Sequence, residues 1–302
     1  MIQAVLIFVL GTVFFTALLS PVVASLIIQF TGELSWPFSR VYDRVGLVVA
    51  VCMLIYLRRR LDLSAVKAYL LQDASRFSRT TLLLVGIALS VVFVLPVLPW
   101  AVDGVSLSWR TGPSVWYYLW KAVKSLVAGL VISVIEESFF RVVVFQNLKK
   151  YFHLYFAALL CSVFYAAVHF IRPDKSFVYS EFSLLSGFEY TLAVVQSAIW
   201  LEFLPALFGL LIVGLILCFV IESTNSLYLC IGLHSGWVFA QKMTHYGTRV
   251  VPGSDLAGIG TRQFDLVSRP EVWGSFVVTF CMLVILVRTL KQRPIPLVET
   301  TS

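Results

Sequence analysis

Charged residues are scarce in this sequence. Only 13% of the 302 residues are Asp, Glu, Lys or Arg, against about 25% in a typical soluble domain. Hydrophobic residues make up 59% of the chain, and its mean hydropathy is +0.91. Because a soluble globular fold cannot bury so much apolar surface, the excess must face lipid. We therefore predict an integral membrane protein.

The sequence also lacks paired cysteines, internal repeats and low-complexity linkers. Its five cysteines stand singly inside apolar stretches, without the C-x-x-C spacing of zinc or redox sites. We interpret them as small core hydrophobes. The first apolar run, from Ala4 to about Phe30, has no basic residue before it and is too long for a signal-peptide core, so we expect a membrane helix there.

The net charge of +7 does not indicate a nucleic-acid partner. Basic residues cluster between apolar segments, as Arg58-Arg59-Arg60, Lys149-Lys150 and Lys291-Gln292-Arg293. That placement is typical of topology determinants beside an anionic leaflet. The expected partner is the lipid bilayer. We expect a multi-pass protein of the cell membrane, most readily the inner membrane of a bacterium, with both termini on the cytoplasmic side.

The apolar segments predict an all-α, polytopic bundle of membrane helices. Since a crossing takes roughly 20 apolar residues, the chain has room for about eight. Pro205 and Gly209 are candidates for a break in the sixth segment, and the polar stretches 58–79 and 247–271 are expected to be loops. The segments fall at 4–30, 42–57, 80–102, 114–147, 151–171, 190–222, 226–246 and 272–290.

The fourth segment carries two adjacent glutamates. An ionisable side chain at membrane depth is costly unless it is paired or hydrated, so each is a functional candidate. Glu137 and Arg141 are four residues apart, with the acid first, which favours a helical ion pair. Glu136 points about 100° away round the helix and is expected to take up and release a proton. The alternative is that both glutamates mark the cytoplasmic end of a span.

Two histidines lie in further apolar segments. His169 ends the fifth segment, one turn after Tyr165, and His234 lies about two turns into the seventh, between Gly232 and Gly236. The small glycines favour close approach of another helix. The structural alternatives are an interfacial cap for His169 and a bond across a helix interface for His234.

Together, these side chains on three segments indicate a hydrolase. A carboxylate can take a proton from a water molecule while histidines orient that water or stabilise the oxyanion. The arrangement requires that Glu136, His169 and His234 reach one hydrated pocket.

The same residues resemble a known family. Glu136-Glu137-Ser138-Phe139-Phe140-Arg141 matches the E-E-x-x-x-R signature of the CAAX protease and bacteriocin-processing family of intramembrane proteases, which includes the type II prenyl endopeptidases. His169 with Tyr165 resembles the F-x-x-x-H motif, and Asn225-Ser226-Leu227-Tyr228 followed by Gly232-Leu233-His234 resembles the third motif. The resemblance covers residues 114–246.

The resemblance divides the chain into three parts. Residues 1–113 hold helices without motifs, 114–246 form the catalytic core, and 247–302 form a loop, a last helix and a cytoplasmic tail.

The resemblance implies a role for each matching residue. Glu136 is the glutamate that activates water, Glu137 and Arg141 are its supporting pair, and His169 and His234 surround the nucleophile. It implies no obligatory cofactor, although two histidines and a glutamate keep zinc as a minor alternative. The implied partner is a peptide or prenylated-protein substrate.

Substrate contacts are expected from Tyr165, Asn225 and Ser235. The sequence departs from the family pattern twice. Tyr165 stands where the motif has Phe, and Val238 stands where prenyl endopeptidases carry an oxyanion-stabilising Asn. Loss of such a donor costs about 3–4 kcal/mol of transition-state stabilisation. Ser235, Asn225 and Gln241 are candidate substitutes.

Three functions follow from these observations. The leading one is an intramembrane endopeptidase that cleaves a hydrophobic or prenylated peptide. The first alternative is a catalytically inactive relative that acts as a membrane scaffold or immunity-type binding protein, as Val238 would suggest. The second is a proton-coupled transporter, although the sequence lacks the internal repeats common in transporters.

Overall fold

The computed structural model describes residues 2–61, 63–71, 78–98, 102, 107–169, 177, 179, 182–197, 204–253 and 266–291. Helices dominate this part of the chain, as an all-α fold requires, and two short strands pair as one antiparallel ribbon. The elements are α1 (Ile2–Thr31), α2 (Phe38–Leu57), α3 (Leu63–Leu71), α4 (Arg79–Val94), the 3-10 turn η1 (Leu95–Val97), β1 (Leu107–Trp109), α6 (Val115–Glu137), the π-helix η2 (Ser138–Phe145), α7 (Gln146–Leu148), α8 (Leu154–His169), α9 (Ser186–Ser197), α10 (Leu204–Thr224), α11 (Leu227–Gly247), β2 (Thr248–Val250), the 3-10 turn η4 (Leu266–Ser268) and α13 (Pro270–Lys291).

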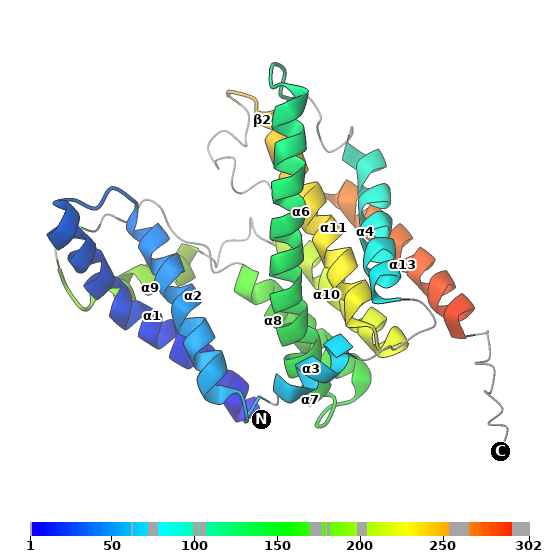
Figure 1. The fold of residues 1–302 in the computed structure, drawn as a ribbon, viewed down its shortest axis with the longest axis horizontal. Coiled ribbons are helices and arrows are strands. Elements are labelled where there is room, and N and C mark those ends of the chain that lie inside the picture. The colour runs from blue at the N-terminus through cyan, green and yellow to red at the C-terminus, as the bar shows by residue number, and fades with distance from the viewer. Residues whose placement is uncertain are drawn as a thin grey trace.

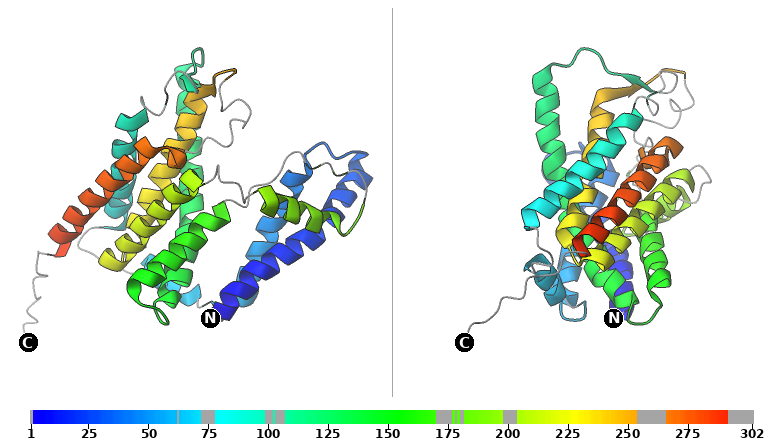
Figure 2. Two further views of the ribbon diagram at one scale, coloured as in Figure 1. Left: turned by 180° about the vertical axis from the view of Figure 1, so that it is seen from behind. Right: turned by 90° about the vertical axis from the view of Figure 1, so that its right-hand side faces the viewer.

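The helices form two groups (Figure 1). α1, α2 and α9 pack together, and Tyr42 and Thr191 join α2 to α9 by a hydrogen bond of 2.7 Å between their hydroxyls. The larger group contains α4, α6, α8, α10, α11 and α13, and Figure 2 shows it from two further sides. The groups meet near η2, where the ring of Phe8 lies 5.1 Å from that of Phe139 and Val143 is buried against α1 and α2.

α11 is the central helix of the larger group, and it packs against α4 on one side and α6 on another. Gly232 and Gly236 make the approach to α4 possible. A Cβ atom at Gly232 would overlap with the carbonyl oxygen of Leu83, and one at Gly236 with the hydroxyl of Ser90. The prediction that these glycines allow close approach is therefore confirmed. His234 lies between them and is held at a fixed depth in the bundle.

Helices long and apolar enough to cross a membrane are present, but not all eight predicted crossings are established. In the described part of the chain, four stretches are long and apolar enough to span a bilayer. α8 is apolar but has only 16 residues, whereas α6 and α11 have 23 and 21 residues and carry the ionisable side chains of the site. The four stretches are Gln3–Thr31, Arg79–Val97, Leu204–Thr224 and Pro270–Arg288.

Three predicted segment assignments differ from the structure. The stretch 58–79 is not wholly a loop, because α3 occupies Leu63–Leu71, a sequence in which basic residues on both sides obscure a short apolar helix. The predicted segment 190–222 is two helices, α9 and α10. Pro205 is the second residue of α10, where its missing N–H costs no helical hydrogen bond, and Gly209 lies inside the same unbroken helix. Of the predicted loop 247–271, residues 248–250 are strand β2.

Candidate active site

A change of helix type marks the site. α6 ends at Glu137, and the chain continues without a break as the π-helix η2, which contains Arg141. π-helical turns within α-helices are rare and frequent at functional sites. Here the wider turn begins directly after the two glutamates, so Glu136 and Glu137 end a regular helix while Arg141 follows on a different helical path.

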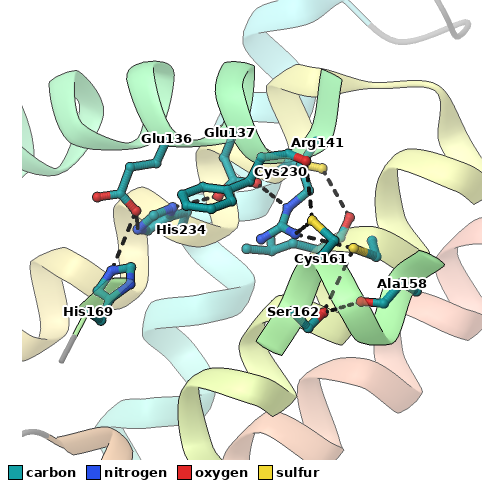
Figure 3. Close-up of polar contacts among 12 residues, drawn as sticks. Glu136, Glu137, Arg141, Ala158, Cys161, Ser162, His169, Cys230 and His234 are labelled. Atoms are coloured by element: carbon teal, nitrogen blue, oxygen red, sulfur yellow. Dashed lines mark hydrogen bonds and ion pairs between the residues drawn. The ribbon is translucent and has the colours of Figure 1, made fainter. Parts of the chain in front are cut away.

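Glu137 lies at the centre of a fully buried network. Its Oε2 accepts a hydrogen bond of 2.8 Å from Nε of Arg141, and both side chains are 0% exposed. Its Oε1 lies 2.8 Å from Nδ1 of His234, which reaches it from α11. The predicted ion pair between Glu137 and Arg141 is confirmed, and the network also includes His234 (Figure 3).

Glu136 points toward the two histidines from the other side of the helix. Its Oε2 is 3.6 Å from Nε2 of His169 and 3.9 Å from Nε2 of His234. The side chains of Glu136 and His169 are 26% and 29% exposed, whereas that of His234 is 5% exposed. The predicted convergence of these three side chains, from α6, α8 and α11, is confirmed (Figure 3).

The hydrogen-bond partners of the histidines fix which ring nitrogen carries the proton. Nδ1 of His169 lies 2.7 Å from the carbonyl oxygen of Tyr165, which can only accept, so Nδ1 is the donor. Nδ1 of His234 likewise donates to the carboxylate of Glu137. In neutral imidazoles both Nε2 atoms are then acceptors, and they face the Glu136 carboxylate, a third acceptor. Three converging acceptors suit a ligand that brings hydrogen-bond donors, and a water molecule brings two.

These groups open into a cavity of about 320 Å³. Its wall is mostly apolar, with residues from α4, α6, α8, α10, α11 and α13 such as Val94, Ile132, Leu210 and Phe276. The ionisable and polar side chains that line it are Glu136, Tyr165, His169, His234, Gln241 and Lys242. The cavity therefore combines an apolar wall with one polar cluster.

Tyr165 joins the two halves of the site. It is buried and lines the cavity, its ring lies 4.5 Å from that of His169, and the guanidinium carbon of Arg141 lies 5.2 Å from its centre. The ring also meets the edge of the His234 ring at 6.1 Å.

The other four residues discussed as substrate contacts, or in connection with the oxyanion donor, take different places. Val238 lines the cavity, and so does Gln241. As far as the described residues define the lining, the structure does not bring Asn225 or Ser235 into it. Asn225 is exposed in the turn before α11, where its φ of 51° suits an amide side chain, and the buried Ser235 donates to the carbonyl oxygen of Ile231 at 2.6 Å. Of the candidate substitutes for the missing Asn, Gln241 is the one that lines the cavity.

Sequence reasoning missed two residues that contact Arg141. Its Nη1 lies 3.5 Å from Sγ of Cys161 and 3.2 Å from Sγ of Cys218. The sequence carried a signal for the first, because Cys161, Tyr165 and His169 follow one another at intervals of four on α8 and so share one face. No comparable spacing marks Cys218.

The zinc alternative requires at least three ligand side chains around one point. Among the residues that the structure describes, no three His, Cys, Asp or Glu side chains form such a group. Glu136, His169 and His234 come nearest in chemical type.

The same region of the chain matches a protein family. Residues 118–240 match the family described as Type II CAAX prenyl endopeptidase Rce1-like. Comparisons with curated proteins and with solved structures found no match. The matched region contains both glutamates, Arg141 and both histidines of the cluster. This region of the chain is therefore similar to the family of type II CAAX prenyl endopeptidases.

Proposed function

We propose that this protein is an intramembrane endopeptidase whose water nucleophile is activated by Glu136. One observation carries the proposal: the carboxylate of Glu136 and the Nε2 atoms of His169 and His234 face each other at 3.6 and 3.9 Å in one cavity. The family match over residues 118–240 supports it independently.

The proposed reaction begins with a water molecule among the three acceptors. Glu136 takes one proton from this water, and the water oxygen attacks the carbonyl carbon of the scissile peptide bond. The carbonyl oxygen becomes an oxyanion in a tetrahedral intermediate. Collapse of the intermediate breaks the C–N bond, and the protonated Glu136 returns the proton to the leaving amine. The products are a carboxylic acid and an amine. Transfer of the acid's remaining proton to the amine gives a carboxylate and an ammonium group, so atoms and charge balance.

The buried network supports this chemistry from behind. His234 is held by the hydrogen bond to Glu137, and Glu137 is held in turn by Arg141. Because Nδ1 of the imidazole is held by a hydrogen bond, Nε2 stays oriented toward the reacting atoms and little reorganisation is needed. His169 is fixed in the same way by the carbonyl oxygen of Tyr165.

The substrate we propose is a hydrophobic or prenylated peptide. The apolar wall, including Leu210, Val213 and Phe276, favours an apolar segment near the scissile bond. The description of the matched family, prenyl endopeptidase, points to a prenylated peptide. The substrate would reach the site from the cytoplasmic side or laterally from the bilayer.

Cleavage of internally quenched peptides by the purified protein in detergent micelles tests the proposal. The panel contains farnesylated peptides and hydrophobic peptides without the lipid. Glu136→Gln keeps the shape of the side chain but removes the base, and we expect kcat to fall by about 10²–10⁴-fold, the usual contribution of a general base. In His234→Ala, kcat should fall at least as far.

Matched controls use the same residue types outside the cluster. Glu222→Gln changes a glutamate at the end of α10, and His153→Ala changes an exposed histidine before α8. Both should leave kcat unchanged. Full activity of Glu136→Gln, or no cleavage of any peptide by the wild type, contradicts the proposal.

A further inference from the structure

Arg141 is an unusual cation because it is fully buried and only part of its guanidinium group is bonded to a carboxylate. Nε donates to Glu137, whereas Nη1 points to two sulfur atoms. Among the described residues, Nη2 has no hydrogen-bond partner. The carboxylate alone therefore does not fix the plane of the guanidinium group. The thiols of Cys161 (Figure 3) and Cys218 provide its further contacts.

The sulfur atoms come from two helices and are available as acceptors. The thiol of Cys161 donates to the carbonyl oxygen of Phe140 at 3.3 Å, so its lone pairs are free to accept from Arg141. Sγ of Cys218 lies 4.0 Å from Oγ of Ser162, a hydroxyl whose own proton goes to the carbonyl oxygen of Ala158. Since a guanidinium group only donates, both contacts to Nη1 have the polarity of N–H···S hydrogen bonds.

These contacts connect to the reacting groups through Arg141. Arg141 orients Glu137, and Glu137 orients His234, whose other nitrogen faces Glu136. We infer that Cys161 and Cys218 are positioning residues: by accepting from Nη1 of Arg141, they fix the ion pair that holds His234 in the active cavity. This inference rests on the proposed function.

The competing interpretation is that both cysteines only fill the core, as small apolar residues commonly do. Cys230 separates the two interpretations. It is fully buried in the same core, but its thiol donates to the carbonyl oxygen of Leu217 at 3.6 Å, and no hydrogen bond to Arg141 is described for it. Replacing Cys230 removes the same volume from the same bundle and leaves the guanidinium contacts intact.

The test compares Ala and Ser variants at Cys161, Cys218 and Cys230. A hydrogen bond to a charged group has an energy that corresponds to about a tenfold change in rate, so Cys218→Ala should lower kcat about tenfold with KM unchanged. Cys161→Ala, which loses the longer contact, should lower kcat less. Cys230→Ala should leave kcat unchanged, although its unfolding temperature should fall as far as that of Cys218→Ala.

Serine gives the sharper discrimination. A hydroxyl restores an acceptor but not an apolar surface, so Cys218→Ser should recover most of the wild-type kcat. If the cysteine only fills space, Ser should be no better than Ala, because a buried hydroxyl is costly in an apolar core. Recovery of kcat by Ser at Cys218, with kcat unchanged in both Cys230 variants, supports the inference.

Each failure has its own signature. If the wild-type protein cleaves the peptides but Cys218→Ala and Cys230→Ala have the same kcat, the inference is wrong and the proposed function stands. Absence of wild-type cleavage overturns the proposed function itself. If Cys218→Ala does not fold, Cys218→Ser decides, since a kcat about tenfold or more below that of the wild type in this variant also overturns the inference.

Discussion

The carboxylate of Glu137 accepts a hydrogen bond of 2.8 Å from Nδ1 of His234, a residue 97 positions later in the chain. Its second oxygen accepts a hydrogen bond of the same length from Arg141. One carboxylate thus satisfies two buried basic side chains from two helices. The packing of α6 against α11 brings the partners together, and the network couples stability of the bundle to orientation of the site.

Replacing Glu137 should therefore damage both folding and activity. Glu137→Gln supplies one acceptor oxygen for two donors and leaves the Arg141 cation without its counter-charge. Removing one member of a buried ion pair costs about 3–5 kcal/mol, and we expect a loss of that size in the free energy of unfolding. Denaturant unfolding in mixed micelles, followed by tryptophan fluorescence, measures it.

Glu222→Gln is the matched control for stability. Glu222 pairs with Lys149, but both side chains are about one-third exposed, so loss of that pair should cost only about 0–1 kcal/mol. If both variants lose the same stability, the buried network does not have the structural role inferred from its burial.

Tyr165→Phe tests the departure from the expected aromatic residue. The ring of Tyr165 packs on His169 and Arg141, and Phe keeps that ring. Activity should stay within about threefold of the wild type, since only the hydroxyl contribution is lost. Tyr165→Ala removes the ring and should destabilise the protein by about 3–5 kcal/mol. Peptide cleavage and thermal unfolding of both variants give the comparison, and a large loss of kcat in Tyr165→Phe would assign the hydroxyl a role in the reaction.

Val238→Asn tests the missing oxyanion donor. Val238 lines the cavity together with Glu136 and His234, so an amide at this position would face the reacting atoms. An oxyanion donor in optimised geometry contributes about 10²–10³-fold to kcat, and we expect a gain of about tenfold from a newly introduced one. Val238→Leu, which adds volume without a donor, is the control. No gain, or an equal change in both variants, would contradict the expectation and favour Gln241 as the donor already present.

Much of the site was predictable because ionisable residues in apolar segments are few and must have partners. The spacing of Glu137 and Arg141 predicted their ion pair, and the glycines beside His234 predicted a close helix. The π-helix after Glu137 was not predictable, because local spacing does not distinguish it from a regular turn. The contact of Cys218 with Arg141 depends on how α10 packs against α8, which is a long-range property of the fold.

Segment boundaries were less predictable for a related reason. A run of apolar residues reports hydrophobicity, but not where one helix ends and the next begins. The apolar pattern therefore predicts one segment where the structure has two helices, α9 and α10. It does not predict α3, which lies between basic clusters. Asn225 matched a family motif, yet its position in a turn shows that a motif match does not place a side chain in a cavity.

Gly232→Ala tests whether the contact of α11 with α4 sets the position of His234. A methyl group at Gly232 would overlap with the carbonyl oxygen of Leu83, a backbone atom that can move only if the helices separate. We expect lower stability, by about 1–3 kcal/mol as for other overpacked cores, and a larger loss of kcat, because His234 would move away from Glu136.

Gly274→Ala on α13 is the matched control, since nothing lies within 4 Å of a Cβ atom there among the described residues. Because alanine is the better helix former, Gly274→Ala should raise stability by up to about 1 kcal/mol and keep full activity. Thermal unfolding and peptide cleavage, measured side by side, decide the matter: wild-type kcat in Gly232→Ala would mean that the site tolerates displacement of α11 and that the glycine contact does not position the histidine.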